Sequence, residues 1–220
     1  MNTIYFIRHG QSTANAGGIT VNNHSIPLSN LGLIQAERLA TKQLSLLPSQ
    51  PNKVYTSSYL RTQQTAKPYC QAVNVSSVVH PIFHEFTNID PLLLHGMTGD
   101  ERWPFIKAYW DKADPHLRQG VHAETFIEFD DRVSEFMKQV YLFENNTVLF
   151  GHGIFFSLLI WKNLGFKVNN STGMAAFRQF QIALPMPNCG IYTLKYTDTK
   201  QNTAANLLQI STVLPSMAMD

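Results

Sequence analysis

Three short stretches of the sequence place arginine or histidine beside small residues. They are Arg8-His9-Gly10, Ser57-Ser58 followed by Arg61, and Gly151-His152-Gly153. Two guanidinium groups and two imidazoles that meet at one place repel one another unless an anion lies between them. The planar donors of arginine match phosphate oxygens especially well, and glycine lets the backbone approach a bound group closely. If the fold brings these stretches together, they form a pocket for a phosphate group.

The pattern of apolar residues predicts the elements that hold these stretches. Short apolar, β-branched runs alternate with longer segments at helical spacing, which is typical of a largely parallel α/β sheet with helices on its faces. We expect strands over 3–7, 53–56, 77–83 and 146–150, and helices over 31–47, 59–73, 125–142 and 153–164. Ligands of such sheets bind outside the carboxyl ends of the strands, where the three stretches lie. Ser57 and Ser58 are expected to cap the following helix, and the N–H groups that begin two of the helices favour an anion.

The remaining segments predict an insertion and an antiparallel margin. Between Glu85 and Glu124, prolines and glycines break the periodicity around two apparent short helices, and a loop-rich insertion of this length is usually a lid or a binding element. Residues 180–184, 190–196 and 206–213 alternate like antiparallel strands, so we expect a mixed sheet. Because the sequence shows no repeat and no linker, we expect a single domain over 1–220 with a cap insertion at about 85–124.

Composition and charge exclude several classes of partner. The 17 Lys and Arg residues against 15 Asp and Glu residues give a net charge of +2, and no basic run offers a footprint for nucleic acid or an anionic membrane. Cys70 and Cys189 lack the spacing of metal ligands, and a chain of 220 residues needs no disulfide. The residues before Arg8 lack the features of a signal peptide, and no apolar stretch reaches about 18 residues. We therefore expect a cytoplasmic protein without nucleic-acid or membrane partners.

The three stretches also resemble the signature motifs of a known family. Arg8-His9-Gly10-Gln11-Ser12 with Asn15, the run from Ser57 to Ala66, and Gly151-His152-Gly153 are similar, in the same order, to those of the histidine phosphatase superfamily, the phosphoglycerate-mutase-like proteins. The likeness covers nearly the whole chain, and three spaced motifs are far more specific than one Arg-His-Gly. It implies a three-layer α/β sandwich with a mostly parallel mixed sheet, flanking helices and a cap insertion.

The resemblance implies a role for each residue of the pocket. His9 would be the nucleophile that takes the phosphoryl group onto a ring nitrogen, with Arg8, Arg61 and His152 as further catalytic residues. The residues expected to bind the phosphate are Arg8, Asn15, Arg61, His152 and Gly153. Phosphoryl transfer asks a protein mainly for positioning and positive charge, and imidazole is a covalent nucleophile that needs no metal. Neither a metal nor a cofactor is therefore expected.

A leaving alcohol needs a proton, so one carboxylic acid must reach the bridging oxygen. Glu85 is the candidate, because it follows the strand expected over 77–83 and the family takes its acid from that region. Glu124, at the start of the helix over 125–142, is the alternative. The alternative is that Glu85 has no catalytic role and forms a salt bridge to a pocket arginine or to Arg102.

Two other features weigh on these assignments. His80, His84 and Glu85 suggest a metal site, but Pro81 forbids the helix on which such ligands would share a face. The sequence also departs from the family, with Ser25 where an aspartate is usual and Ala123 where a glycine often precedes Glu124. Neither departure touches the expected phosphate pocket.

The sequence thus predicts a metal-independent phosphatase that hydrolyses the monoester of a small phosphorylated metabolite through a phosphohistidine at His9. Three alternatives stay open. A mutase would use the same pocket but return the phosphoryl group, and a phosphatase of protein phosphohistidine or phosphotyrosine would need an open mouth. A relative that only binds phosphate would not need an unblocked nucleophile. The oligomeric state is also open, a homodimer included.

Overall fold

The first strand of the chain lies in the middle of a mixed sheet. The computed structural model describes residues 2–184, 186–196 and 209–213. In this part of the chain six strands pair in the order β3-β2-β4-β1-β5-β6. Their bounds are β1 (Asn2–Arg8), β2 (Val54–Thr56), β3 (Ser77–Val79), β4 (Thr147–Gly151), β5 (Ile191–Tyr196) and β6 (Gln209–Val213).

The register of the parallel strands aligns their carboxyl ends. In the pair of β1 and β4, Arg8 lies opposite Gly151, and in the pair of β2 and β4, Thr56 lies opposite Phe150. β3 is also parallel to β2, whereas β5 pairs antiparallel with both β1 and β6. The mixed sheet with an antiparallel margin is therefore confirmed. Residues that follow β1, β2 and β4 in sequence emerge together at one edge of the sheet.

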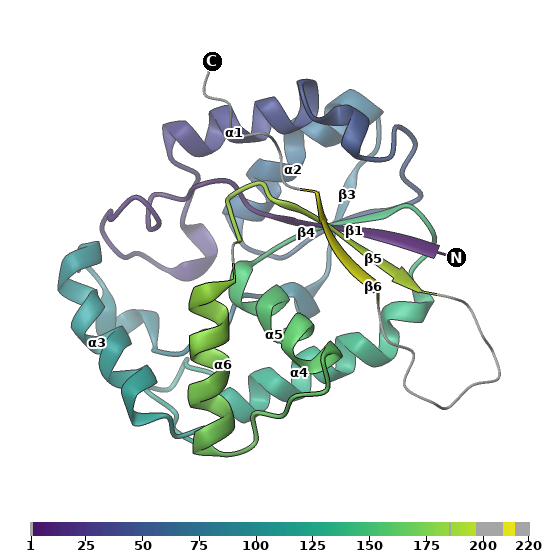
Figure 1. The fold of residues 1–220 in the computed structure, drawn as a ribbon. Coiled ribbons are helices and arrows are strands. Elements are labelled where there is room, and N and C mark those ends of the chain that lie inside the picture. The colour runs from purple at the N-terminus through teal and green to yellow at the C-terminus, as the bar shows by residue number, and fades with distance from the viewer. Residues whose placement is uncertain (1, 185, 197–208, 214–220) are drawn as a thin grey trace.

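Helices cover both faces of this sheet (Figure 1), with α1 and α2 on one face and α4, α5 and α6 on the other. Their bounds are α1 (Asn30–Thr41), α2 (Leu60–Val73), α3 (Gly99–Lys112), α4 (Phe126–Gln139), α5 (Gly153–Asn163) and α6 (Ser171–Ala183). Because side chains alternate along a strand, Phe6 faces the cluster under α5, where its ring stacks on Phe156 at 4.2 Å. Its neighbour Ile7 faces the opposite cluster with Leu39 and Tyr69. The three-layer α/β class is confirmed.

The segment between Glu85 and Glu124 contains less irregular structure than its prolines suggest. A short 3₁₀ turn, Pro91–Leu94, precedes the 14-residue α3, where two short helices were predicted. The helix begins with a capping box of Thr98 and Glu101, which satisfies two N–H groups reciprocally. Arg102 then donates hydrogen bonds to the carbonyl groups of Ala14 and Gly18. The segment is thereby fastened to the loop that follows β1.

Several predicted boundaries are wrong, and one element is of the wrong type. Residues 180–184, predicted as a strand, end the helix α6. Met174 and Phe177, three residues apart, both pack into the core, and this helical spacing outweighs the local alternation of apolar residues. The predicted helix over 31–47 ends at Thr41, and the strand over 77–83 ends at Val79, before a 3₁₀ turn. Positions 206–208 of the last predicted strand lie outside the described residues.

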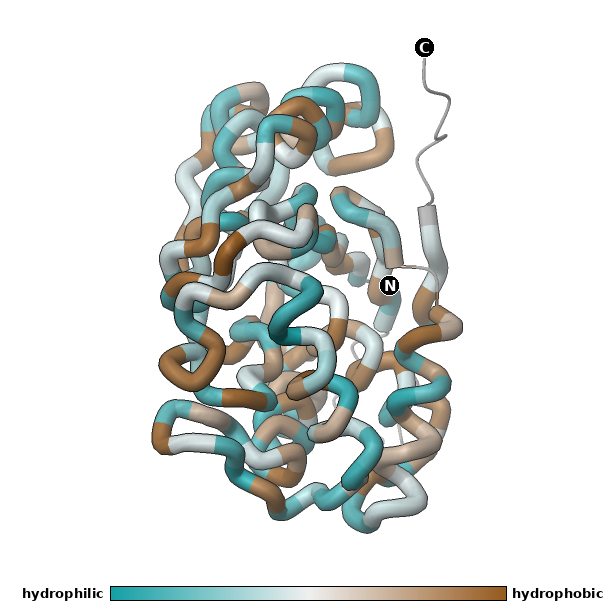
Figure 2. The backbone as a smooth tube through the Cα atoms, turned by 90° about the vertical axis from the view of Figure 1, so that its left-hand side faces the viewer, coloured by the Kyte–Doolittle hydropathy of each residue, from teal (hydrophilic) through white to brown (hydrophobic). Residues whose placement is uncertain are grey.

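Polar and apolar residues interleave along the backbone (Figure 2). Among the helices of the described residues, none has the length and apolar character needed to cross a membrane.

Cys70 and Cys189 are both free thiols, and Cys189 is buried.

Gly32 lets the first turn of α1 contact the loop that follows β1. A Cβ atom at this position would lie 2.0 Å from the carbonyl oxygen of Gln11, which is backbone and cannot swing away. Alanine inside a helix ordinarily stabilises it by about 1 kcal/mol relative to glycine. We expect the opposite for Gly32→Ala, a loss of about 1–3 kcal/mol in the free energy of unfolding, because overpacking forces the backbone apart.

Chemical denaturation measures this loss. Glu37→Ala, at an exposed position of the same helix, is the matched control and should stay within about 0.5 kcal/mol of the wild type. A Gly32→Ala variant as stable as the wild type would contradict the close contact.

Candidate active site

The ends of three neighbouring strands bring the predicted pocket together. His9, Ser57 and His152 each follow the last residue of β1, β2 and β4, and the rings of His9 and His152 lie 5.2 Å apart, edge to face. A cavity of about 490 Å³ opens at this edge. The predicted site residues that line it are Arg8, His9, Asn15, Arg61, Glu85 and Gly153. His152 is fully buried and contacts this group through His9.

His9 is held in one orientation and one tautomer. Its Nδ1 lies 2.7 Å from the carbonyl oxygen of Gly10, and because a carbonyl only accepts, Nδ1 carries the proton. Nε2 therefore keeps its lone pair, which accepts a hydrogen bond from Nε of Arg61 at 3.3 Å. Burial lowers the pKa of His9 well below its usual 6.5, and the charges of Arg61 and Arg8 lower it further. A neutral imidazole with an unprotonated Nε2 is the state that a nucleophile requires.

Arg61 supplies one positive charge of the site from the first turn of α2. Its Nη1 donates to the carbonyl oxygen of Asn23 at 2.9 Å, and its guanidinium lies 4.6 Å above the ring of Tyr59. Burial lowers the pKa of Arg61 to about 10, so the group stays charged at neutral pH. The cation–π contact holds the guanidinium beside His9.

Arg8 supplies the second charge. One of its terminal nitrogens donates to the carbonyl oxygen of Met186, while its buried Nε has no partner among the described residues. Gly153 permits this placement, because a Cβ there would lie 3.3 Å from Nε of Arg8. Burial lowers the pKa of Arg8 below its usual value, yet the guanidinium stays protonated at neutral pH, as arginine does throughout proteins. Buried donors without acceptors are rare in proteins, and a phosphoryl oxygen would supply the missing acceptor.

His152 is held by Ser57, a residue that was predicted to cap α2. Its Nε2 lies 2.8 Å from Oγ of Ser57, while its Nδ1 is buried without a partner among the described residues. The prediction that Ser57 and Ser58 cap α2 is wrong, because the N-cap is Tyr59 and its side chain makes no capping bond. The position of Ser57 directly after β2 is the signal that could have shown its place in the site.

Glu85 lies at the start of α5 rather than in a salt bridge. Its Oε2 accepts from the N–H of Ile154 and its Oε1 from that of Phe155, both at 3.1 Å, and Phe86 donates to Oε1 as well. The ion pairs among the described residues do not include Glu85. Two N–H groups of α5 that were expected to bind the phosphate therefore bind this carboxylate.

The protonation of Glu85 reflects opposing influences. Burial raises its pKa above the usual 4.5, while the three N–H donors and the charge of Arg61 lower it, and burial prevails. Oε2 accepts a single hydrogen bond and keeps a lone pair for a proton. A carboxyl with a raised pKa that lines the same cavity as His9 has the properties of a general acid.

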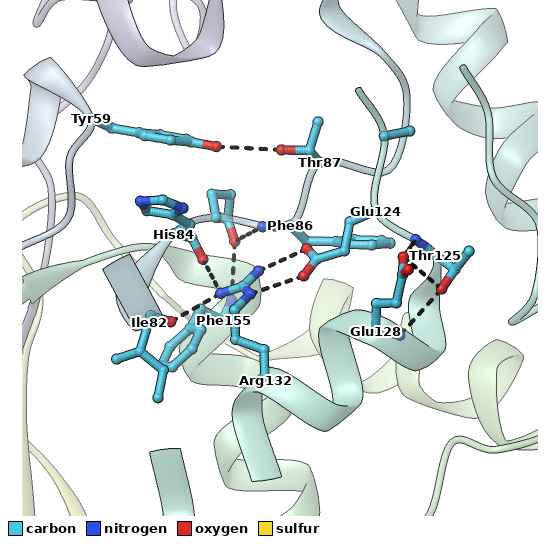
Figure 3. Close-up of polar contacts among 12 residues, drawn as sticks. Tyr59, Ile82, His84, Phe86, Thr87, Glu124, Thr125, Glu128, Arg132 and Phe155 are labelled. Atoms are coloured by element: carbon cyan, nitrogen blue, oxygen red, sulfur yellow. Dashed lines mark hydrogen bonds and ion pairs between the residues drawn. The ribbon is translucent and has the colours of Figure 1, made fainter. Parts of the chain in front are cut away.

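Glu124 is committed elsewhere. Its carboxylate forms a two-pronged ion pair with Arg132, at 2.9 and 2.7 Å, and Figure 3 shows the two groups facing each other. Arg132 also donates to the carbonyl groups of Ile82 and His84. Glu124 does not line the cavity that contains His9. The geometry favours Glu85 as the acid, and Glu124 instead pairs with Arg132, the residue of α4 that ties this helix to the segment after β3.

The histidines near Glu85 do not gather as metal ligands. Nδ1 of His80 accepts from the N–H of Ile82 within the 3₁₀ turn, and Nε2 of His84 lies 2.8 Å from Oγ of Ser58. Across the described part of the chain, no three His, Cys, Asp or Glu side chains are grouped closely enough to hold a metal ion.

Asn15 lines the cavity from the loop after β1, where its Oδ1 accepts from the N–H of Ser12 at 3.2 Å. Sequence reasoning missed much of the remaining lining, above all Ile106 from the middle of α3 and side chains from the end of α6. Those from α6 lie where a strand was predicted, so a helical interpretation of residues 171–183 would have been needed to find them.

Comparison with known proteins assigns the family. The model of the histidine phosphatase superfamily (branch 1) matches residues 4–206. The chain therefore belongs to the histidine phosphatase superfamily. No curated protein matches the sequence.

Solved structures share the fold at low identity. An Escherichia coli protein provisionally assigned as an alpha-ribazole-5′-phosphate phosphatase is 19% identical with a TM-score of 0.73, over 97% of this chain and 96% of that one. A mycobacterial glucosyl-3-phosphoglycerate phosphatase with VO3 is 19% identical with a TM-score of 0.67, over 96% and 97%. A phosphoserine phosphatase from Entamoeba histolytica is 15% identical with a TM-score of 0.70, over 98% of each chain.

The buried histidines make the stability of the protein depend on pH. Below pH 6.5 the unfolded chain binds a proton at each histidine, whereas folded His9 does so only well below that pH. Lowering the pH through 6.5 therefore costs stability. We expect the wild type to lose about 1 kcal/mol more than His9→Gln between pH 6.5 and 5.5.

Denaturation series in phosphate-free buffer measure the difference. His116→Gln, which replaces an exposed imidazole, is the matched control and should retain the wild-type loss. Equal losses in the wild type and His9→Gln would show that His9 is not held neutral.

Proposed function

We propose that this protein is a phosphatase that hydrolyses a phosphate monoester through a phosphoryl group carried on Nε2 of His9. The observation that carries the proposal is the state of His9. Its Nδ1–H donates to Gly10, its Nε2 is unprotonated, and Arg61 lies 3.3 Å from that nitrogen. A buried imidazole between two guanidinium groups favours reaction with a phosphate dianion, whose charge the arginines balance.

In the first step, Nε2 of His9 forms a bond to phosphorus as the ester P–O bond breaks. The departing alcohol oxygen takes the proton of the Glu85 carboxyl, so that a neutral alcohol leaves. Arg8 and Arg61 balance the charge on the phosphoryl oxygens during the transfer. The bond from Nδ1–H to Gly10 strengthens as the imidazole ring becomes positive.

In the second step, a water oxygen attacks phosphorus and the bond to Nε2 breaks. The Glu85 carboxylate accepts the proton of the water, which restores the acid and releases inorganic phosphate. One group thus serves as acid and then as base, as microscopic reversibility requires of a two-step displacement. None of these steps calls for a metal ion.

A small phosphorylated molecule suits the site better than a folded protein. The cavity of about 490 Å³ lies within the range of small-molecule sites. The segment of 85–124 forms part of its wall through Ile106 of α3, which limits the approach of a bulky partner. The names of the similar structures, phosphatases for alpha-ribazole phosphate, glucosyl-3-phosphoglycerate and phosphoserine, support a phosphorylated metabolite as substrate.

Replacement of the nucleophile tests the reaction itself. His9→Ala should reduce phosphate release from an aryl phosphate by at least about 10³-fold, because no phosphoryl-enzyme can form. Release by the wild type should persist with a chelator, and acid quenching should trap an acid-labile phosphoryl group. A phosphoryl-enzyme without phosphate release would point to a mutase. Release that is independent of His9 would refute the proposal.

Replacement of the two carboxylates tests the acid. Glu85→Gln should lower kcat/KM for an alkyl phosphate by about 10²–10⁴-fold, because the alkoxide then leaves without a proton. The same variant should lose less than about tenfold on 2,4-dinitrophenyl phosphate, whose leaving group needs no proton.

Glu124→Gln is the matched control and should stay close to the wild type on both esters. Equal losses of Glu85→Gln on the two esters would mean that Glu85 only holds α5 in place. A selective loss in Glu124→Gln on the alkyl ester would move the acid to that residue.

A further inference from the structure

The cavity at the sheet edge has two chemically different parts. Its floor carries the charged groups Arg8, Arg61 and Glu85 beside His9. The apolar residues of its wall are Ala14, Ile26, Ile106, Ile154, Ile182, Leu184 and Met186, and the uncharged polar side chains of Ser12, Asn15, Asn23, Ser157 and Gln181 also line the cavity. A phosphoryl group occupies the floor in the proposed reaction, so the alcohol part of the ester lies against the wall.

Part of the wall comes from two helices that contribute no reacting group, α3 and α6. Ile106 lies on α3, and Ile182 near the end of α6, with Leu184 as its C-cap. Ile182 is 61% exposed although it lines the cavity, so an apolar ligand there would cover surface that water now contacts. The apolar wall therefore has the features of a binding surface for the alcohol.

The wall also lacks a charge that would attract a second anionic group. Among the described residues that line the cavity, Arg8 and Arg61 alone carry a permanent positive charge, and both are needed by the phosphoryl oxygens. A carboxylate on the alcohol would have no cation of its own, and it would lie near the acidic Glu85.

The other nearby arginines are engaged elsewhere. Arg102 binds the backbone of the loop after β1 and the hydroxyl of Thr20. Arg178 bonds to the side chain of Gln181 and lies 4.7 Å above the ring of Trp110. Arg132 is paired with Glu124. An anionic group on the substrate would have to break one of these contacts to gain an arginine as its partner.

We propose that the cavity is built for the monoester of an uncharged alcohol with an apolar body, aromatic or aliphatic, and discriminates against alcohols that carry a carboxylate or a second phosphate. This inference rests on the proposed function for its reaction. The preference itself comes from the wall and not from the reacting groups.

A pair of esters with the same reacting bond tests the preference. Benzyl phosphate and 4-carboxybenzyl phosphate release primary alcohols and differ by one distant carboxylate. We expect the wild type to show a kcat/KM at least about tenfold higher for benzyl phosphate, because the carboxylate loses water and finds no cation of its own among the described residues that line the cavity. Equal or reversed values would overturn the inference while leaving the proposed function intact.

A charge placed on the wall tests its location. Ile182→Lys puts an ammonium group at an exposed position of the cavity, so the fold should tolerate it. We expect the preference for benzyl phosphate to fall by at least about fivefold. Ile34→Lys is the matched control, because Ile34 is 51% exposed on α1 and does not line the cavity. The same fall in both variants would mean that net charge, not the wall, sets the preference.

The affinity for phosphonates that cannot be hydrolysed tests the substrate preference independently of the proposed reaction. Benzylphosphonate and 4-carboxybenzylphosphonate cannot be hydrolysed, and calorimetry gives their affinities for the wild type directly. Tighter binding of benzylphosphonate by about tenfold, in a protein that turns over neither ester, would refute the proposed function and support the apolar cavity. Equal affinities, or no binding of either phosphonate, would overturn the inference.

Discussion

Backbone hydrogen bonds among β1, β4 and β2 set the relative positions of the reacting groups. The strands are parallel and end together, with Arg8 opposite Gly151 and Thr56 opposite Phe150. A slip of one residue in either pair would turn the following side chain toward the opposite face of the sheet. The buried cores on both faces prevent such a slip, because each strand would then present the wrong side chains to its helices. The precision of the site is thus a property of the sheet as a whole.

Within that frame, the electrostatic design is one of excess positive charge with a single nearby carboxylate. Arg8 and Arg61 are largely buried and lower the pKa of His9 between them. An ion pair with Glu85 would satisfy them, but it would also neutralise the site toward its substrate. The N–H groups of α5 hold Glu85 instead, so the two guanidinium groups form no ion pair with it. Desolvation of these charged groups is the energetic cost of the arrangement.

The extent to which sequence predicts this structure differs between the floor and the wall of the cavity. The floor follows from local signals, since apolar periodicity places β1 and β4, and the next residues are then at the sheet edge. The wall depends on how α3 and α6 pack against the rest of the chain, which no local pattern encodes. Residues 180–184 show the difficulty, because Phe180, Ile182 and Leu184 alternate like a strand. Only the packing of Phe180 into the core cluster that also contains Phe177, three residues earlier, shows the helix.

The side-chain partners were harder to predict than the elements. Ser57 occupies a position at which serine usually caps a helix, and its bond to His152 depends on a strand 95 residues away in sequence. Likewise, Glu85 could be placed near the site from its strand, but its partners on α5 come from a separate part of the chain. The sequence predicted several residues that line the cavity, but not the hydrogen bonds that hold them.

The attachment of Glu85 to the first turn of α5 links the proton on this carboxyl to the dipole of a helix. A helix N-terminus carries about half a positive elementary charge, and Glu85 sits on that charge through two N–H groups. When the carboxyl gives up its proton, the aligned peptide dipoles of α5 stabilise the new anion without any group having to move. Burial raises the pKa of this carboxyl, and the helix stabilises its anion. The same helix begins directly after His152, so the backbone that holds Glu85 is continuous with the end of β4.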